Sequence, residues 1–340
     1  MGLPKFRHKS KKKEVTDVVS EEAAARKRRI LPFLFLLPLF IFICFAWISP
    51  MILTIYLSFT DLSIRNLLTF AVKYTTENFE KIFLAKDPYI VDVLKTTVFY
   101  VVSVLSINAI YALILSVAIA YLVKNEIISM FLRISWLLPR ITPGIIYALL
   151  WIWFVDPRAG LLNKLLMTVG VPQQLLPGSW LLEKPHAQLL LVIINGYVGA
   201  SFGMIVYTAA IKSIPPDLIN AALVDGATDF QVVRRVMIPL LKWPILFVTA
   251  WQTLSLLASY EYILMVWGAG GGGGDYAGVA RAAGVMVWSL YSYSKAFSEY
   301  QYGYAAAISM VLVVIGVILI LSYFKIFGFK RLMEPSRVEV

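Results

Sequence analysis

Residues 212–242 read KSIPPDLINAALVDGATDFQVVRRVMIPLLK, and they lie between two long apolar segments. Pro215 and Pro216 fit the start of a helix, where a missing backbone N–H costs nothing, and Asp217 complements the positive end of the helix dipole. Gly226 fits a left-handed residue that stops this helix. The first half of the segment therefore predicts a short helix with a defined start and end.

A second short helix is predicted directly after the first. Thr228 and Gln231 have the spacing of a capping box, and Pro239 is expected to interrupt the helix that they begin. The segment is then predicted to form a compact helix–turn–helix element at the membrane surface, which a partner on the aqueous side can bind. An ordinary amphipathic loop helix is an alternative, whereas a DNA-binding helix–turn–helix would need a soluble domain that this chain lacks.

The chain as a whole is strongly apolar. Its 340 residues are 59% hydrophobic, against about 45–50% in soluble domains, and the mean hydropathy is +0.76. Six segments carry at most one charge and exceed the ~20 residues that cross a bilayer as a helix: 30–59, 96–123, 134–155, 187–211, 243–267 and 301–324. The pattern predicts an all-α, polytopic membrane protein with six transmembrane helices.

The cationic residues predict an orientation for these helices. Of the 31 lysines and arginines, 20 fall in alternate segments, 1–29, 124–133, 212–242 and 325–340. Only 10 fall in the segments between them, and Arg140 lies within a span. By the positive-inside rule, both termini and the 212–242 element are cytoplasmic. The net charge of +11 then indicates anchoring on anionic lipid headgroups and not nucleic-acid binding.

The 212–242 segment resembles the coupling loop of ABC importer permeases. The family pattern is Glu-Ala-Ala, three further residues, Gly, about nine more residues, and then Ile-x-Leu-Pro. The matching positions are Ala221, Ala222, Asp225, Gly226 and Pro239. Asn220 stands where the family usually has Glu, so hydrogen bonding is kept but the charge is lost. The resemblance implies that these six residues couple the chain to a separate ATPase.

A likeness to the sugar-importing branch of these permeases extends from about residue 30 to residue 330. It is carried by Glu77-Asn78-Phe79, Leu94-Lys95-Thr96-Thr97, Gly160-Leu161-Leu162-Asn163 and Tyr302-Gly303, in the family's order. The resemblance implies a type I ABC importer permease fold over residues 30–329. A basic cytoplasmic tail, residues 1–29, would precede it and a short cytoplasmic tail, residues 330–340, would follow.

The same resemblance implies the partners. They are a second permease subunit, related but different, two ATPase subunits, an extracytoplasmic solute-binding protein and the lipids of a prokaryotic plasma membrane. The sequence contains no Walker motif, so ATP and Mg²⁺ are expected on the ATPase and no cofactor on this chain. No catalytic or metal-binding residue is predicted.

Polar and aromatic residues within two of the spans predict a substrate site. The candidates are Asn195, Gly199, Phe202, Gln252, Tyr260 and Glu261. Asn195, Gly199 and Phe202 share one helical face, with glycines expected to clear space for a ligand. Amide groups and aromatic faces suit a neutral sugar, and resembling permeases hold their sugar midway along these two helices. Helix packing through polar residues is the alternative, and a pairing of Arg140 with Glu261 is left open.

Three other functions are weighed against sugar import. A membrane enzyme would need clustered acids, a metal triad or a Ser/His/Asp set, whereas His8 and His186 have no such companions. An ion-coupled secondary transporter usually has more spans and buried carboxylates, and Glu261 alone is weak support. An ABC permease for a non-sugar solute would keep the same architecture. The sequence favours an ATP-driven importer of a sugar or oligosaccharide.

Overall fold

The computed structural model describes residues 33–69, 71–270 and 275–327. Within these ranges the secondary structure is helical without a β-strand, apart from an isolated bridge between Thr60 and Tyr74. The predicted tails, residues 1–29 and 330–340, lie outside the described residues. The chain divides into two compact units, Met1–Tyr56 and Leu57–Val340.

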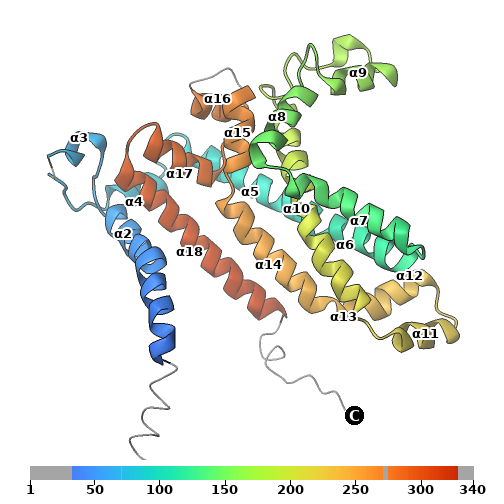
Figure 1. Ribbon diagram of the computed structural model, residues 1–340. Coiled ribbons are helices and arrows are strands. Elements are labelled where there is room, and N and C mark those ends of the chain that lie inside the picture. The colour runs from blue at the N-terminus through green and yellow to red at the C-terminus, as the bar shows by residue number, and fades with distance from the viewer. Residues whose placement is uncertain (1–32, 70, 271–274, 328–340) are drawn as a thin grey trace, which may run out of the picture. The chain divides into compact units, whose positions relative to one another are not determined.

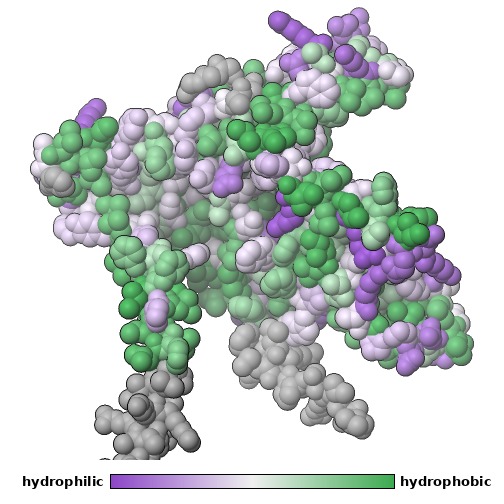
Figure 2. Space-filling model, viewed as in Figure 1, coloured by the Kyte–Doolittle hydropathy of each residue, from purple (hydrophilic) through white to green (hydrophobic). Residues whose placement is uncertain are grey.

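The first unit is dominated by one apolar helix, Phe33–Ser58, whose last part is α2 (Ser49–Ser58). None of its most apolar stretch is buried within the protein, and Figure 2 shows hydrophobic side chains along its surface. Such a helix requires lipid around it, since a hydrophobic surface this continuous is unstable in water. It confirms the helix predicted over residues 30–59.

Long helices also form three predicted spans of the second unit. They are Ile90–Leu122, His186–Lys212 (α10) and Tyr302–Phe327 (α18). The first of these contains α5 (Ile90–Ser106) and α6 (Ala112–Val117), separated and followed by π-helical turns. Figure 1 shows α10 against α5 and α6, and α14 (Lys242–Ala258) between α10 and α18. Each of the three is long enough to cross a bilayer.

The other two predicted spans are not continuous helices. Residues 134–155 fall in α7 (Glu126–Ile141) and α8 (Gly144–Phe154), which meet at 98°. The break is at Thr142, because a residue before proline is driven out of the helical region. Residues 243–267 fall in α14 and α15 (Glu261–Gly270), with Ser259 extended between them.

The number of membrane crossings follows from these breaks. In the described residues, four helices are long and apolar enough to cross a membrane, and the bent α7–α8 pair makes a fifth if it counts as one span. The helix α14 has 17 residues, whereas those four helices have 26 to 33. The structure is therefore that of a polytopic helical membrane protein, and the count of six stays a prediction.

Short helices gather at the two ends of the long ones in the second unit (Figure 1). At one end lie α11 (Pro216–Val224), α12 (Asp229–Val232) and α13 (Ile238–Leu240). At the other lie α3 (Ile64–Leu67), α4 (Glu77–Phe83), α9 (Leu161–Thr168), α16 (Tyr276–Ala282) and α17 (Trp288–Phe297). The short helices in segments predicted to lie outside the membrane thus occur at both ends of the long helices.

Candidate functional site

The first half of the 212–242 element folds as its sequence predicts. Pro215 is the N-cap of α11 and Pro216 its first residue. Gly226 has φ +83°, and its N–H donates to the Leu223 carbonyl while that of Ala227 donates to the Ala222 carbonyl, both at 3.0 Å. This is the hydrogen-bond pattern of a Schellman motif, which closes a helix with a left-handed residue.

For the second half of the element, the predicted start of the helix is correct and the predicted end is wrong. The Thr228 N–H donates to Gln231 Oε1 at 2.8 Å, and the Gln231 N–H donates to Thr228 Oγ1 at 3.4 Å, so the capping box is present. Pro239 does not interrupt the helix, which runs through a π-helical turn, Val233–Met237, to Leu240. The proline stands near the start of α13 after this wider turn, where its missing N–H is tolerated.

The 212–242 element is anchored to the long helices by an apolar base. Its buried residues, with Ile211, are Ile214, Val232, Met237 and Leu241, and they pack against the end of the Ile90–Leu122 helix through Leu113, Val117 and Tyr121. The Tyr121 hydroxyl also donates to Asp229 Oδ1 at 2.7 Å. The element is therefore a fixed part of the fold and not a loose loop.

Ion pairs connect the element to the start of α7. Lys212 Nζ lies 3.0 Å from Glu126 Oε1, and Arg133 lies 3.3 Å from the other oxygen of the same carboxylate. The hydrogen bond and charge of Lys212, with Arg133 beside them, hold the pKa of the Glu126 carboxyl below its usual value. Glu126 thus stays ionised and joins α7 to the end of α10.

The outer face of the element is accessible to a partner. Val224 is 87% exposed and Phe230 is 71% exposed, although both are apolar. The predicted coupling residues Asn220, Ala221, Asp225, Gly226 and Pro239 are also exposed, and Ala222 is half-buried. Exposed apolar side chains on an ordered, polar-rimmed element are typical of a protein interaction surface.

A polar cavity of ≈280 Å³ lies between the middle parts of the long helices. It is lined by Asn108, Arg140, Asn195, Val198, Gly199, Gln252, Ser255, Leu256, Ser259 and Tyr262. The structure thus brings together three of the predicted substrate residues, Asn195, Gly199 and Gln252, from α10 and α14. Phe202, Tyr260 and Glu261 do not line this cavity.

Both predicted amides are hydrogen-bonded to the protein. Asn195 Nδ2 donates to the Leu191 carbonyl at 2.9 Å, and Asn195 Oδ1 accepts from the Tyr100 hydroxyl at 3.1 Å. Gln252 Nε2 donates to the Gly199 carbonyl at 2.8 Å and so links α14 to α10. These bonds orient the two amides at the cavity wall and use half of the hydrogen-bonding capacity of Asn195.

The three residues outside the cavity have other neighbours. The Phe202 ring lies 5.4 Å from the Arg140 guanidinium carbon and packs beside Phe247 and Trp251. Tyr260 stacks on Tyr293, with ring centroids 4.9 Å apart. Glu261 is exposed in the first turn of α15, and the ion pairs among the described residues do not include one between it and Arg140.

Asn108 is a cavity residue that sequence reasoning missed. It is fully buried in the Ile90–Leu122 helix, and neither amide atom has a hydrogen-bond partner within the described chain. A Cβ at Gly199 would collide with this amide, and one at Gly203 would lie 2.7 Å from the Asn108 carbonyl oxygen. The glycines therefore allow two helices to approach, instead of clearing space for a ligand as expected. The detectable signal was a lone amide inside a predicted span.

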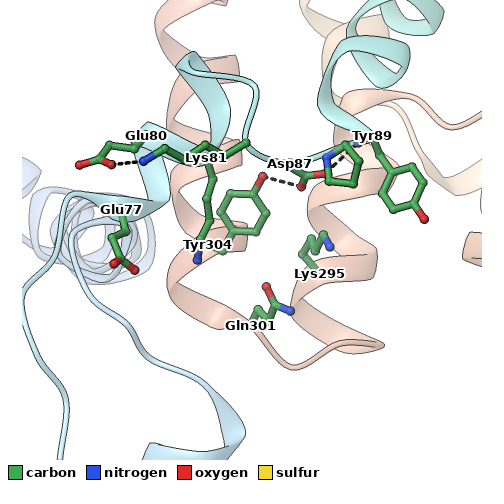
Figure 3. A pocket seen from close by; sticks show the side chains of 10 residues that line it. Glu77, Glu80, Lys81, Asp87, Tyr89, Lys295, Gln301 and Tyr304 are labelled. Atoms are coloured by element: carbon green, nitrogen blue, oxygen red, sulfur yellow. Dashed lines mark hydrogen bonds and ion pairs between the residues drawn. The ribbon is translucent and has the colours of Figure 1, made fainter.

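A second pocket, of ≈390 Å³ (Figure 3), is lined by residues of α4, α17 and α18. These helices meet at the opposite end from the 212–242 element (Figure 1). Asp87 lies at its wall and accepts hydrogen bonds of 2.6 Å from the Tyr291 and Tyr304 hydroxyls. Burial acts to raise the pKa of this carboxyl, but the hydrogen bonds outweigh burial and the pKa is lowered. Lys295 pairs with Glu299 at 2.7 Å beside it. These contacts join the residue 77–89 segment to α17 and α18.

Comparison with known proteins places the chain among transport proteins. The family model described as the binding-protein-dependent transport system inner membrane component matches residues 112–326. The probable ABC transporter permease protein YesP of Bacillus subtilis is 29% identical over 311 residues, which cover 91% of this chain and 94% of the relative. The diacetylchitobiose uptake system permease protein NgcF of Streptomyces coelicolor is 32% identical over 184 residues, 54% of this chain and 49% of the relative.

A solved structure has the same fold. It is the crystal structure of a bacterial alginate ABC transporter in complex with an alginate pentasaccharide-bound periplasmic protein. The matched chain superposes with a TM-score of 0.72 at 21% identity, covering 89% of this chain and 96% of the other. The likeness shows that the two chains share a fold.

Proposed function

Because this chain belongs to the family of binding-protein-dependent transport system inner membrane components, we propose that it carries a sugar or oligosaccharide into the cytoplasm. It is a multi-pass transport subunit of the inner membrane, not an enzyme. One observation carries the choice of function: an ordered, exposed 212–242 element lies at one end of the helices that enclose a polar cavity. A site for mechanical coupling and a site for a solute thus belong to one helical framework.

The energy source is proposed to be a separate pair of ATPase subunits. They would dock on the exposed face of the 212–242 element, with ATP and Mg²⁺ bound to them and not to this chain. Val224 and Phe230 offer apolar contacts, and Asn220 offers a neutral hydrogen-bonding group in place of a charge. Closure of the ATPase pair would shift the element and, through it, the helices around the cavity.

The chain is proposed to form half of a translocation path. A second permease subunit, related but different, would supply the facing wall, and an extracytoplasmic binding protein would deliver the solute. The solved alginate transporter was crystallised with a sugar-bound periplasmic protein, and NgcF belongs to a diacetylchitobiose uptake system. Both support a saccharide as the solute, and the alginate complex supports a binding protein as its source.

Reconstitution tests the proposed energy source. The complete transporter in proteoliposomes, supplied with binding protein and a labelled saccharide, should accumulate the sugar only when ATP is present on the ATPase side. Ionophores that collapse proton and sodium gradients should leave the rate unchanged. Uptake that persists without ATP but stops with the ionophores would instead indicate an ion-coupled secondary transporter.

The proposed orientation has both termini and the 212–242 element in the cytoplasm. Single cysteines at Val224 and Lys81, in a Cys44→Ser background, should react with a membrane-impermeant maleimide from opposite sides. We expect Val224→Cys to be labelled only in inside-out vesicles and Lys81→Cys only in intact cells. Labelling of Lys81→Cys from the cytoplasmic side would contradict the proposed orientation.

A further inference from the structure

The Arg140 side chain is a charged group that the proposed function does not yet use. It lies in the last turn of α7, two residues before the break at Thr142, and lines the polar cavity. Arg140 is exposed, and no hydrogen bond or ion pair joins its guanidinium group to the rest of the described chain. By contrast, Arg133 on the same helix is bound to Glu126 and Ser129.

The surroundings of Arg140 leave its N–H groups available to a ligand. The Phe202 ring lies 5.4 Å from the guanidinium carbon, a cation–π contact that leaves the hydrogen-bonding edge of the group free. The other polar lining groups are neutral, namely the amides of Asn108, Asn195 and Gln252 and the hydroxyls of Ser255, Ser259 and Tyr262. The cavity thus has one positive charge and, among its lining residues, no carboxylate to balance it.

Asn108 adds a second unsatisfied group to the same wall. Its amide is completely buried, yet neither its oxygen nor its nitrogen has a partner in the described chain. The amide packs against Gly199, so Asn108 contributes to the wall without presenting these atoms to the cavity.

From this arrangement we propose that the cavity selects an anionic saccharide, whose carboxylate or phosphate binds Arg140. A guanidinium group presents a planar fork of N–H donors that matches an oxyanion in bidentate fashion. An anionic sugar would balance the charge of Arg140, whereas a neutral sugar would leave it without a counter-charge. The proposal rests on the proposed function and replaces the neutral sugar that the sequence suggested.

The test compares matched sugars in the complete reconstituted transporter. The probes are uronate di- to tetrasaccharides with their carboxyl-reduced counterparts, and sugar phosphates with their dephosphorylated counterparts. We expect at least one anionic sugar to be taken up tenfold or more faster than its neutral counterpart, and the two series separate carboxylate from phosphate. Equal or faster uptake of the neutral members would overturn the proposal and leave sugar import intact. Absence of uptake for every sugar, with ATPase assembly intact, would count against sugar import itself.

Variants then test whether the preference for anionic sugars comes from Arg140. The same binding protein is used with every variant, so a change in preference is due to the substitution. Arg140→Gln should lower uptake of the anionic sugar at least tenfold and change that of the neutral sugar less than twofold, whereas Arg140→Lys should restore part of the preference. Arg158→Gln, which removes an exposed arginine outside the cavity, should change neither rate. An equal loss for both sugars, or loss of the second permease from the purified Arg140→Gln complex, would show a structural role and overturn the proposal.

Discussion

Replacing Gly226 with valine is expected to abolish ATP-driven uptake while the chain remains in the membrane. The residue has φ +83°, a left-handed conformation that costs a side-chain-bearing residue about 1–2 kcal/mol and more when it is β-branched. No atom lies within 4 Å of a Cβ built at this position, so the effect is backbone strain and not a clash. Relief of that strain would break the Schellman motif and misplace α11 against the ATPase.

The structure offers a matched control for this substitution. Gly170 also has positive φ, +95°, and also has open space around a built Cβ. It closes α9 with the same two hydrogen bonds, from its own N–H to Met167 and from Val171 to Leu166. Gly170→Val therefore introduces similar local strain at the opposite end of the protein.

The two glycine variants are compared by co-purification of the ATPase and by uptake in proteoliposomes. Gly226→Val should lose most of the bound ATPase and lower uptake at least tenfold, whereas Gly170→Val should keep both within twofold. Asn220→Ala, which removes a neutral exposed group, should do less harm than Gly226→Val. Full ATPase binding and uptake in Gly226→Val would disprove the coupling assignment of residues 212–242.

Removing the amides of the cavity wall is expected to lower saccharide uptake several-fold. Asn195→Leu leaves the Tyr100 hydroxyl, which is fully buried, without its acceptor, and an unmatched buried polar group costs about 1–3 kcal/mol. Gln252→Leu removes the hydrogen bond between α14 and the Gly199 carbonyl. Both changes also replace a polar cavity wall with an apolar one, which a sugar hydroxyl cannot bind.

Kinetics across two or three sugars separate recognition from packing in these variants. A role in recognition predicts altered KM values and altered preference between sugars, with the subunits still assembled. Ser201→Ala is the control, because Ser201 is fully buried on α10, its hydroxyl has no partner in the described chain, and it does not line the cavity. Unchanged selectivity in both leucine variants, with rates like those of Ser201→Ala, would show that the amides serve only to pack helices.

The 212–242 element could be predicted in detail because local rules determine it. Pro216 begins a helix, Gly226 ends it, and Thr228 with Gln231 caps the next, whatever lies around them. Each of these effects depends on residues within one or two turns. The error at Pro239 has a tertiary origin, because a π-helical turn packed on the apolar base accommodates the proline.

The cavity could be predicted only in part. Asn195 and Gln252 stand out as amides in apolar spans, but hydropathy does not record the breaks at Thr142 and Ser259 that bring Arg140 and Ser259 to the same wall. Phe202 was predicted to share a helical face with Asn195, yet its ring packs against aromatic residues of α14 instead of facing the cavity. Residue spacing within one helix does not determine how its side chains pack against the neighbouring helices.

The contacts at the two ends of α7 have a mechanical consequence. This helix has 16 residues, and at 1.5 Å per residue it is a strut about 24 Å long. Its first residue, Glu126, is held by Lys212 at the base of the 212–242 element, and its last turn carries Arg140 into the cavity. A displacement of the 212–242 element would therefore reach the cavity at the guanidinium group of Arg140, through a single helix.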